Sequence, residues 1–141
     1  MKKTLLIALS LCLCLTAFAK EEVPSEKELK KLALDSLLAF NDAIKQDDFT
    51  EFREQIATLW QKQVTAEQLK SAFAEFIEKK LDISGIKDLQ PTLDPAQINS
   101  DDLLLLNGFY PTTPVKVRFK LKYIQEEGDW KLVSINVSTK D

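Results

Sequence analysis

The sequence contains no histidine, only two cysteines and only three glycines. Without histidine, the chain has no imidazole for a general base, a catalytic triad or a metal ligand. Both cysteines, Cys12 and Cys14, lie near the N-terminus, and the remainder has no thiol for catalysis or zinc binding. The glycines, Gly85, Gly108 and Gly128, are too widely separated to form a phosphate-binding loop. These absences exclude most familiar catalytic and nucleotide-binding arrangements.

The first 19 residues have the organisation of a secretory signal peptide of bacterial type. Lys2 and Lys3 form a basic region. The apolar run Leu5–Leu15 follows, and it is shorter than the roughly 20 residues that span a bilayer. Ala17 and Ala19 give the small-x-small pattern that signal peptidase recognises.

We expect cleavage after Ala19 and a single domain over residues 20–141, periplasmic or secreted and without a membrane span. Retention of the segment as an N-terminal membrane anchor is the alternative. Leucine, not a small residue, precedes both Cys12 and Cys14, so lipoprotein processing is not expected and both cysteines leave with the peptide. The remaining chain must then be stabilised by its core, without a disulfide.

The charge balance is acidic, with 19 basic and 22 acidic residues and a net charge of −3 at pH 7. Loss of Lys2 and Lys3 with the signal peptide would make the remainder more acidic still. An acidic balance argues against a nucleic-acid partner.

The first half of the domain has helical periodicity. Ser25 and Glu28 form a capping-box pattern, and apolar residues then recur at helical spacing to Ile44, which predicts a helix ending near Gln46. A second helix, capped by Asp47 or Asp48, carries apolar residues from Phe49 to Trp60. A third begins at a second capping box, Thr65 with Gln68, and turns Leu69, Ala72, Phe73, Phe76 and Ile77 inward.

The second half changes to strand patterns. Strands are predicted at Leu103–Tyr110, Val115–Gln125 and Trp130–Thr139, and the last two are joined by a hairpin turn at Glu126–Asp129, where Gly128 allows a positive φ. A further strand within 88–98 is restricted to an edge by its two prolines. Helices followed by strands indicate an α+β fold.

The segment Val115–Tyr123 alternates strictly between apolar residues and cations. The apolar residues are expected to face the helices, and the cations to face outward. We call these cations the cationic strip: Lys116, Arg118, Lys120 and Lys122. Two interpretations stay open, a solvated surface or a site for an acidic partner of the cell envelope. The strip disfavours an apolar sheet-to-sheet dimer, and both a monomer and a homodimer stay open.

Four stretches resemble small exported bacterial members of the nuclear transport factor 2-like (cystatin-like cone) superfamily: "FNDAIKQDDFTEF", "VTAEQLKSAFAEF", "GFYPTTPVKVRFKLKY" and "GDWKLVSINV". The resemblance spans about Ser25 to Thr139. It implies three N-terminal helices packed on a curved antiparallel sheet of three to four strands, which form a cone with a pocket at its open end. It does not imply an activity, because this superfamily contains both enzymes and non-catalytic proteins.

We therefore predict a non-catalytic binding or interaction module without a cofactor. A pocket for a small apolar ligand is predicted between the third helix and the sheet, beside Trp60, Phe73, Tyr110 and Tyr123. The alternative is that these aromatic side chains fill the interior themselves.

An isomerase or dehydratase is the alternative function. It would need a carboxylate base, supplied by Asp101 or Asp102, and a hydroxyl from Tyr110 or Tyr123 to stabilise an oxyanion. The adjacent acids lack the alternating loop that calcium requires, so we expect capping and turn roles for them and no metal site.

Overall fold

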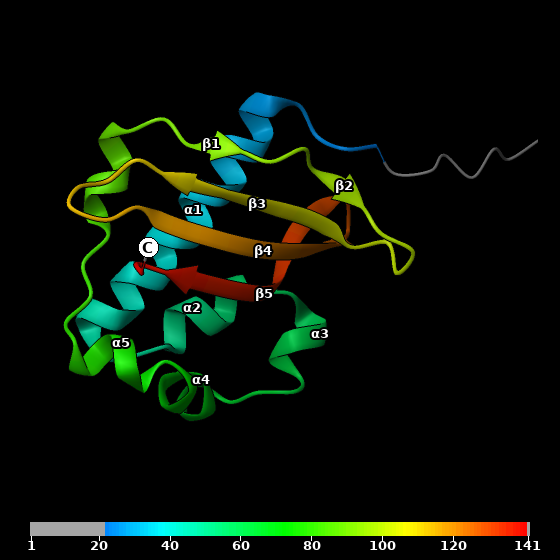
Figure 1. Cartoon of the computed structure of the whole chain (residues 1–141). Helices are drawn as coiled ribbons and strands as arrows, with labels where there is room; N and C mark the ends of the chain where they lie inside the picture. Colours follow the sequence, from blue (N-terminus) through cyan, green and yellow to red (C-terminus); the bar gives the residue numbers. More distant parts are fainter. Residues whose placement is uncertain (1–21, 141) are drawn as a thin grey trace, which may run out of the picture.

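The computed structural model describes residues 22–140, which form helices packed against an open antiparallel sheet (Figure 1). The chain therefore has an α+β fold, as the sequence predicted. The predicted signal peptide, residues 1–19, lies outside the described residues. None of the described helices combines the length and apolar character needed to cross a bilayer.

Helix α1, Glu26–Gln46, confirms the first predicted helix, and both of its caps are formed. The Ser25 hydroxyl accepts a hydrogen bond from the Glu28 N–H at 3.3 Å, and the Glu28 carboxylate accepts one from the Ser25 N–H at 3.0 Å. Asp47 ends the helix in the left-handed region with φ 54°. The buried side of α1 includes Leu37 and Phe40, which lie against the sheet and the remaining helices.

The second predicted helix is broken into α2, Thr50–Gln55, and α3, Thr58–Gln61. The break falls at Ile56, whose backbone is extended with φ −78° and ψ 169°. The next residue, Ala57, is buried and donates its N–H to the Leu132 carbonyl at 2.8 Å. A long-range hydrogen bond to the sheet therefore replaces a helical one at this position.

The third predicted helix is likewise divided at Phe73 into α4, Ala66–Ala72, and α5, Ala74–Glu78. Its predicted capping box is present, since the Thr65 hydroxyl accepts from the Gln68 N–H at 3.1 Å. The 3-10 helix η1, Ser84–Asp88, leads into the sheet.

The sheet has the order β1-β3-β4-β5, with β2 also paired to β3, and every pairing is antiparallel. The long strands match the predicted ones: β3 is Leu104–Tyr110, β4 is Val117–Glu126 and β5 is Asp129–Ser138. The segment with two prolines supplies only β1, Thr92–Leu93, and β2, Gln97–Ile98.

The turn between β4 and β5 uses two left-handed residues, Glu127 with φ 52° and Gly128 with φ 85°. Two consecutive positive φ values fit the right-handed twist of a hairpin, which confirms the turn predicted from Gly128.

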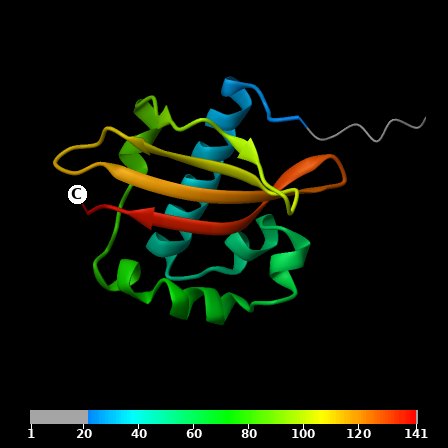
Figure 2. The same cartoon turned by 45° about the vertical axis from the view of Figure 1, so that its right-hand side comes forward.

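One face of the sheet is buried. Helix α1 passes behind the sheet, and α2 to α5 lie beyond its β5 edge (Figures 1 and 2). Of the predicted inward residues, Val117, Phe119, Leu121 and Tyr123 are buried against this helical layer. Val115 is not, because it lies in a bend before β4 begins and is only partly buried. The opposite face carries the cationic strip and is not covered by helices.

Candidate functional site

The structure distributes the four predicted pocket residues among different environments. Phe73 lies in a cluster of phenylalanines, with its ring centroid 4.9 Å from that of Phe40. Trp60 packs at the edge of the same cluster, and Tyr110 packs on the sheet with its centroid 5.7 Å from that of Phe119. The aromatic side chains in this part of the interior thus pack against one another. Of the four, Tyr123 is the one that borders the groove described next.

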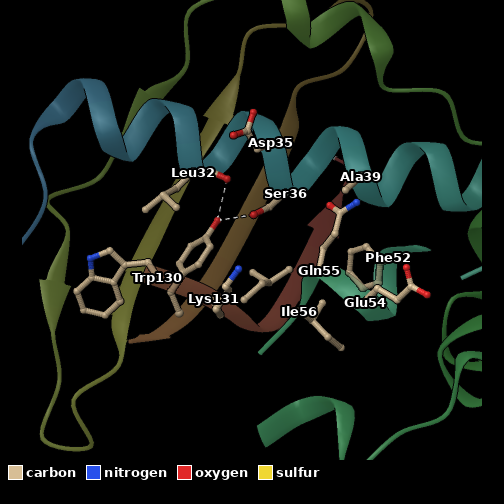
Figure 3. A pocket seen from close by; sticks show the side chains of 12 residues that line it. Leu32, Asp35, Ser36, Ala39, Phe52, Glu54, Gln55, Ile56, Trp130 and Lys131 are labelled. Atoms are coloured by element: carbon tan, nitrogen blue, oxygen red, sulfur yellow. Dashed lines mark hydrogen bonds between the residues drawn. The ribbon is translucent and has the colours of Figure 1, made fainter. Parts of the chain in front are cut away.

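A groove of about 350 Å³ lies between α1, α2 and the hairpin end of β4 and β5 (Figure 3). We call it the Tyr123 groove. Its apolar surface comes from both helices and the sheet, and its main apolar lining residues are Leu32, Ala39, Phe52, Ile56, Trp130 and Leu132. Ser36 and Tyr123 add hydroxyl groups to this lining.

The break between α2 and α3 and a bulge in β5 help to form the groove. The break brings Ile56 beside the sheet, where the following residue bonds to Leu132. In the β4–β5 ladder, Lys122 pairs with Ser134 whereas Tyr123 pairs with Leu132, so Val133 is the extra residue of a bulge. A bulge increases the local twist of a strand and re-aims its side chains.

Tyr123 connects the sheet to α1. Its hydroxyl donates to the Leu32 carbonyl at 3.0 Å and lies 2.8 Å from the Ser36 Oγ (Figure 3). A phenol has a single proton, so the Ser36 hydroxyl must donate to Tyr123 while Tyr123 donates to Leu32. Burial raises the pKa of the Tyr123 phenol well above its usual range, and it stays neutral at physiological pH.

The carboxylates beside the groove are exposed. Asp35 and Glu54 both line it, but both side chains are solvent-accessible, and Asp35 is paired with Lys31. The alternative bases, Asp101 and Asp102, are exposed in the turn that precedes β3 and lie outside the groove lining. No carboxylate among the groove-lining residues is therefore buried in apolar surroundings.

Several other carboxyl groups have a lowered pKa. Backbone and side-chain hydrogen bonds from Ser84 lower the pKa of Asp82 to about 2. The Thr58 N–H lowers the pKa of Glu126 in the same way. A general base for an isomerase requires the opposite shift, which burial in an apolar site produces.

The cationic strip faces outward, as predicted, and all four of its side chains are exposed. Its three members within β4 have uncharged partners on both sides: Phe109, Asn107 and Leu105 on β3, and Ser138, Asn136 and Ser134 on β5. The Lys116 Nζ lies 4.5 Å from the centroid of the Phe109 ring, and the Arg118 guanidinium lies 5.8 Å from it. Within residues 22–140, none of the four cations forms an ion pair with a carboxylate.

Sequence reasoning missed Ser36, Ile56 and Leu132 as groove residues. Ser36 had a detectable signal, since it lies four residues from both Leu32 and Phe40 on the apolar side of a helix. A hydroxyl at such a position needs a partner in the interior. The other two depend on the helix break and the bulge, which have no comparable local pattern.

No family model matches the chain, and comparisons with curated proteins and with solved structures found no match either. The resemblance to the nuclear transport factor 2-like superfamily thus stays a prediction.

Proposed function

We propose that this protein is an exported, non-catalytic binding module that holds a small, mainly apolar ligand in the Tyr123 groove. We further propose that its α+β fold is a variant of the nuclear transport factor 2-like cone, in which this groove corresponds to the open end. The observation that carries the proposal is an open volume of about 350 Å³ whose lining combines apolar side chains with hydroxyls and with polar groups at its rim, and which contains no buried acid. Pockets for small ligands typically begin at about 300 Å³.

The hydrogen bonds of the groove indicate which polar group the ligand carries. The Ser36 proton is used by Tyr123, and the Tyr123 proton is used by the Leu32 carbonyl. The Ser36 Oγ therefore offers lone pairs rather than a proton. A ligand with an apolar body and one N–H or O–H donor fits this arrangement best.

The same hydrogen bonds argue against the isomerase or dehydratase alternative. An oxyanion needs a hydroxyl that is free to donate, whereas the Tyr123 proton already points to a backbone carbonyl. The nearby acids Asp35 and Glu54 are exposed, so they lack the apolar surroundings that raise the pKa of a catalytic carboxylate.

The proposal is tested by filling the groove. Ala39 lines it, and Ala39→Phe would occupy part of its volume. The matched control is Ala72→Phe, an exposed position on α4 outside the groove lining. The probe is N-phenyl-1-naphthylamine, a neutral apolar fluorophore with one N–H donor.

We expect saturable binding to the unaltered protein, at least about tenfold weaker binding to Ala39→Phe and an unchanged dissociation constant for Ala72→Phe. Ser36→Ala should weaken binding less, because it removes the acceptor and the hydrogen bond to Tyr123 but does not fill the groove. Circular dichroism verifies that each variant is folded. Equal binding by the two phenylalanine variants, or no binding to the unaltered protein, would contradict the proposal.

A further inference from the structure

We propose that the cationic strip docks an extended acidic segment of a partner protein, with carboxylates at alternate positions. The strip lies on the face of the sheet opposite α1, whereas the Tyr123 groove lies on the α1 side. The two sites therefore differ in location and in ligand chemistry, and the docking proposal does not depend on the groove.

The spacing of the strip matches an extended peptide. Arg118, Lys120 and Lys122 occupy alternate positions of β4, and alternate strand residues lie about 6.7 Å apart. Lys116 extends the row just before the strand begins. A second chain in an extended conformation repeats its side chains at the same interval, so carboxylates at every second residue would match the cations one to one.

Within the described part of the chain, no carboxylate lies within ion-pairing distance of the strip. The cross-strand partners of Arg118, Lys120 and Lys122 are uncharged, and none of these cations is ion-paired within residues 22–140. Elsewhere on the surface, cations such as Lys31, Lys45, Lys70 and Lys79 do have acidic partners. Like charges in a row repel one another, and an external anionic segment would relieve this repulsion.

The flanking residues favour recognition of a peptide. On one side, the Phe109 ring holds Lys116 and Arg118 over its face, which restrains these long side chains and leaves their N–H groups available. On the other side, Ser134, Asn136 and Ser138 line β5 with groups that can hydrogen-bond to a peptide backbone. Because β4 is already paired on both sides, the segment would lie across the side chains rather than join the sheet.

The shape of the charge distribution separates a peptide from larger polyanions. The strip is a single row along β4 and the residue just before it, while the protein as a whole has a net charge of −3. A membrane surface or a long nucleic acid would extend beyond the row and meet the acidic remainder of the surface. A short acidic segment would contact the cationic strip alone, so it is the partner that fits the charge distribution best.

The test uses a fluorescein-labelled peptide in which glutamate and threonine alternate, with binding followed by fluorescence anisotropy at low salt. The control peptide, called the block peptide, has the same composition but places all glutamates in one block. The test variant replaces the whole strip: K116Q, R118Q, K120Q and K122Q. The matched control makes the same change in net charge at exposed lysines elsewhere: K27Q, K62Q, K80Q and K87Q.

We expect the alternating peptide to bind at least about tenfold more tightly than the block peptide, and to lose at least about tenfold in affinity with the strip variant. The control variant should change the affinity less than about threefold, and added salt should weaken binding because the contact is electrostatic.

Three results would overturn the proposal. One is no binding of the alternating peptide at low salt, and another is equal loss of binding in the strip and control variants. The third is tighter binding to vesicles containing phosphatidylglycerol or to single-stranded DNA than to the peptide, which would indicate a membrane or a nucleic acid as the partner.

Discussion

The two faces of β4 differ in burial, in packing and in charge. On the inner face, Leu121 is fully buried and Tyr123 is 1% exposed, and both pack against the helical layer. On the outer face, Lys120 and Lys122 are exposed and have uncharged neighbours. The comparison indicates that core packing and surface charge are separated between positions one residue apart, so each can be altered without the other.

The first prediction has the largest expected effect and compares a substitution in the core with one at the adjacent, exposed residue. Leu121→Ala should lower the free energy of unfolding by about 2–5 kcal/mol, since Leu121 is 0% exposed and its removal leaves a cavity. Lys120→Ala should change the free energy of unfolding by less than about 0.5 kcal/mol. Urea denaturation of both variants measures the difference, and similar losses would refute the division between the faces.

The second prediction concerns Gly108, which lies opposite Phe119 in the ladder. A Cβ built there would lie 2.3 Å from the Thr92 carbonyl oxygen and 3.1 Å from the Phe119 ring. Gly108→Ala must therefore displace β1, and we expect a loss of about 1–3 kcal/mol in the free energy of unfolding. Gly85→Ala is the control because nothing lies within 4 Å of the added carbon, and it should be close to neutral.

The third prediction is a loss of stability in alkali. Burial raises the pKa of the Tyr110 phenol to about 12 from an ordinary value of 10.0, and it raises that of Tyr123 as well. The stability due to the neutral Tyr110 phenol is complete below pH 10.0 and is lost as pH rises toward 12, whereas the contribution of Tyr123 is lost at higher pH. The loss should reach up to about 2 kcal/mol for Tyr110.

Phenolate absorbance and unfolding experiments across this pH range test the third prediction. The matched variant is Tyr110→Phe combined with Tyr123→Phe, which should show a smaller pH dependence. Ionisation of both phenols at an ordinary pKa in the folded protein would contradict burial of the inner face.

The fourth prediction separates the hydroxyl of Tyr123 from its ring. Tyr123→Phe keeps the packing but removes the hydrogen bonds to Leu32 and Ser36, so we expect a loss of about 1 kcal/mol in the free energy of unfolding. Thermal denaturation measures the loss. Tyr110→Phe should lower the free energy of unfolding by less, because its hydroxyl makes no comparable hydrogen bond to α1. The reverse order would argue against the Tyr123 hydrogen bonds as the link between the sheet and α1.

The smallest effect is expected on the outer face. Neutralising the whole cationic strip should change the free energy of unfolding by less than about 1 kcal/mol, and any change should be stabilising at low salt because repulsion within the row is removed. Denaturation at two salt concentrations tests this. A large loss of stability would mean that the strip supports the fold.

The sequence predicted the strongly periodic parts of this fold. The capping boxes at Ser25 and Thr65 and the alternation around Phe119 are local patterns, and the structure has each element where they indicate it. The broken helices were not predicted, because apolar spacing continues through Ile56 and Phe73 while the hydrogen bond from Ala57 to the sheet is a tertiary contact. Tertiary contacts of this kind override local propensity.

The candidate site was predicted less completely. The outward direction of the cations followed from the pleat, which alternates side chains between the two faces. The predicted pocket depended on how distant aromatic residues meet, and here Phe73 joins a phenylalanine cluster while Tyr123 borders a groove. That outcome depends on the bulge at Val133 and on the break at Ile56, which the residue types do not reveal.

The hydrogen bond from Ala57 to Leu132 also bears on strand addition at the free edge of the sheet. β5 ends the sheet, and the exposed backbone of a terminal strand invites strand addition by another molecule. The kink between α2 and α3 already occupies a carbonyl on that strand, and the adjoining helices lie beside it. Growth of the sheet into an intermolecular β-aggregate on this side would first require that kink to detach.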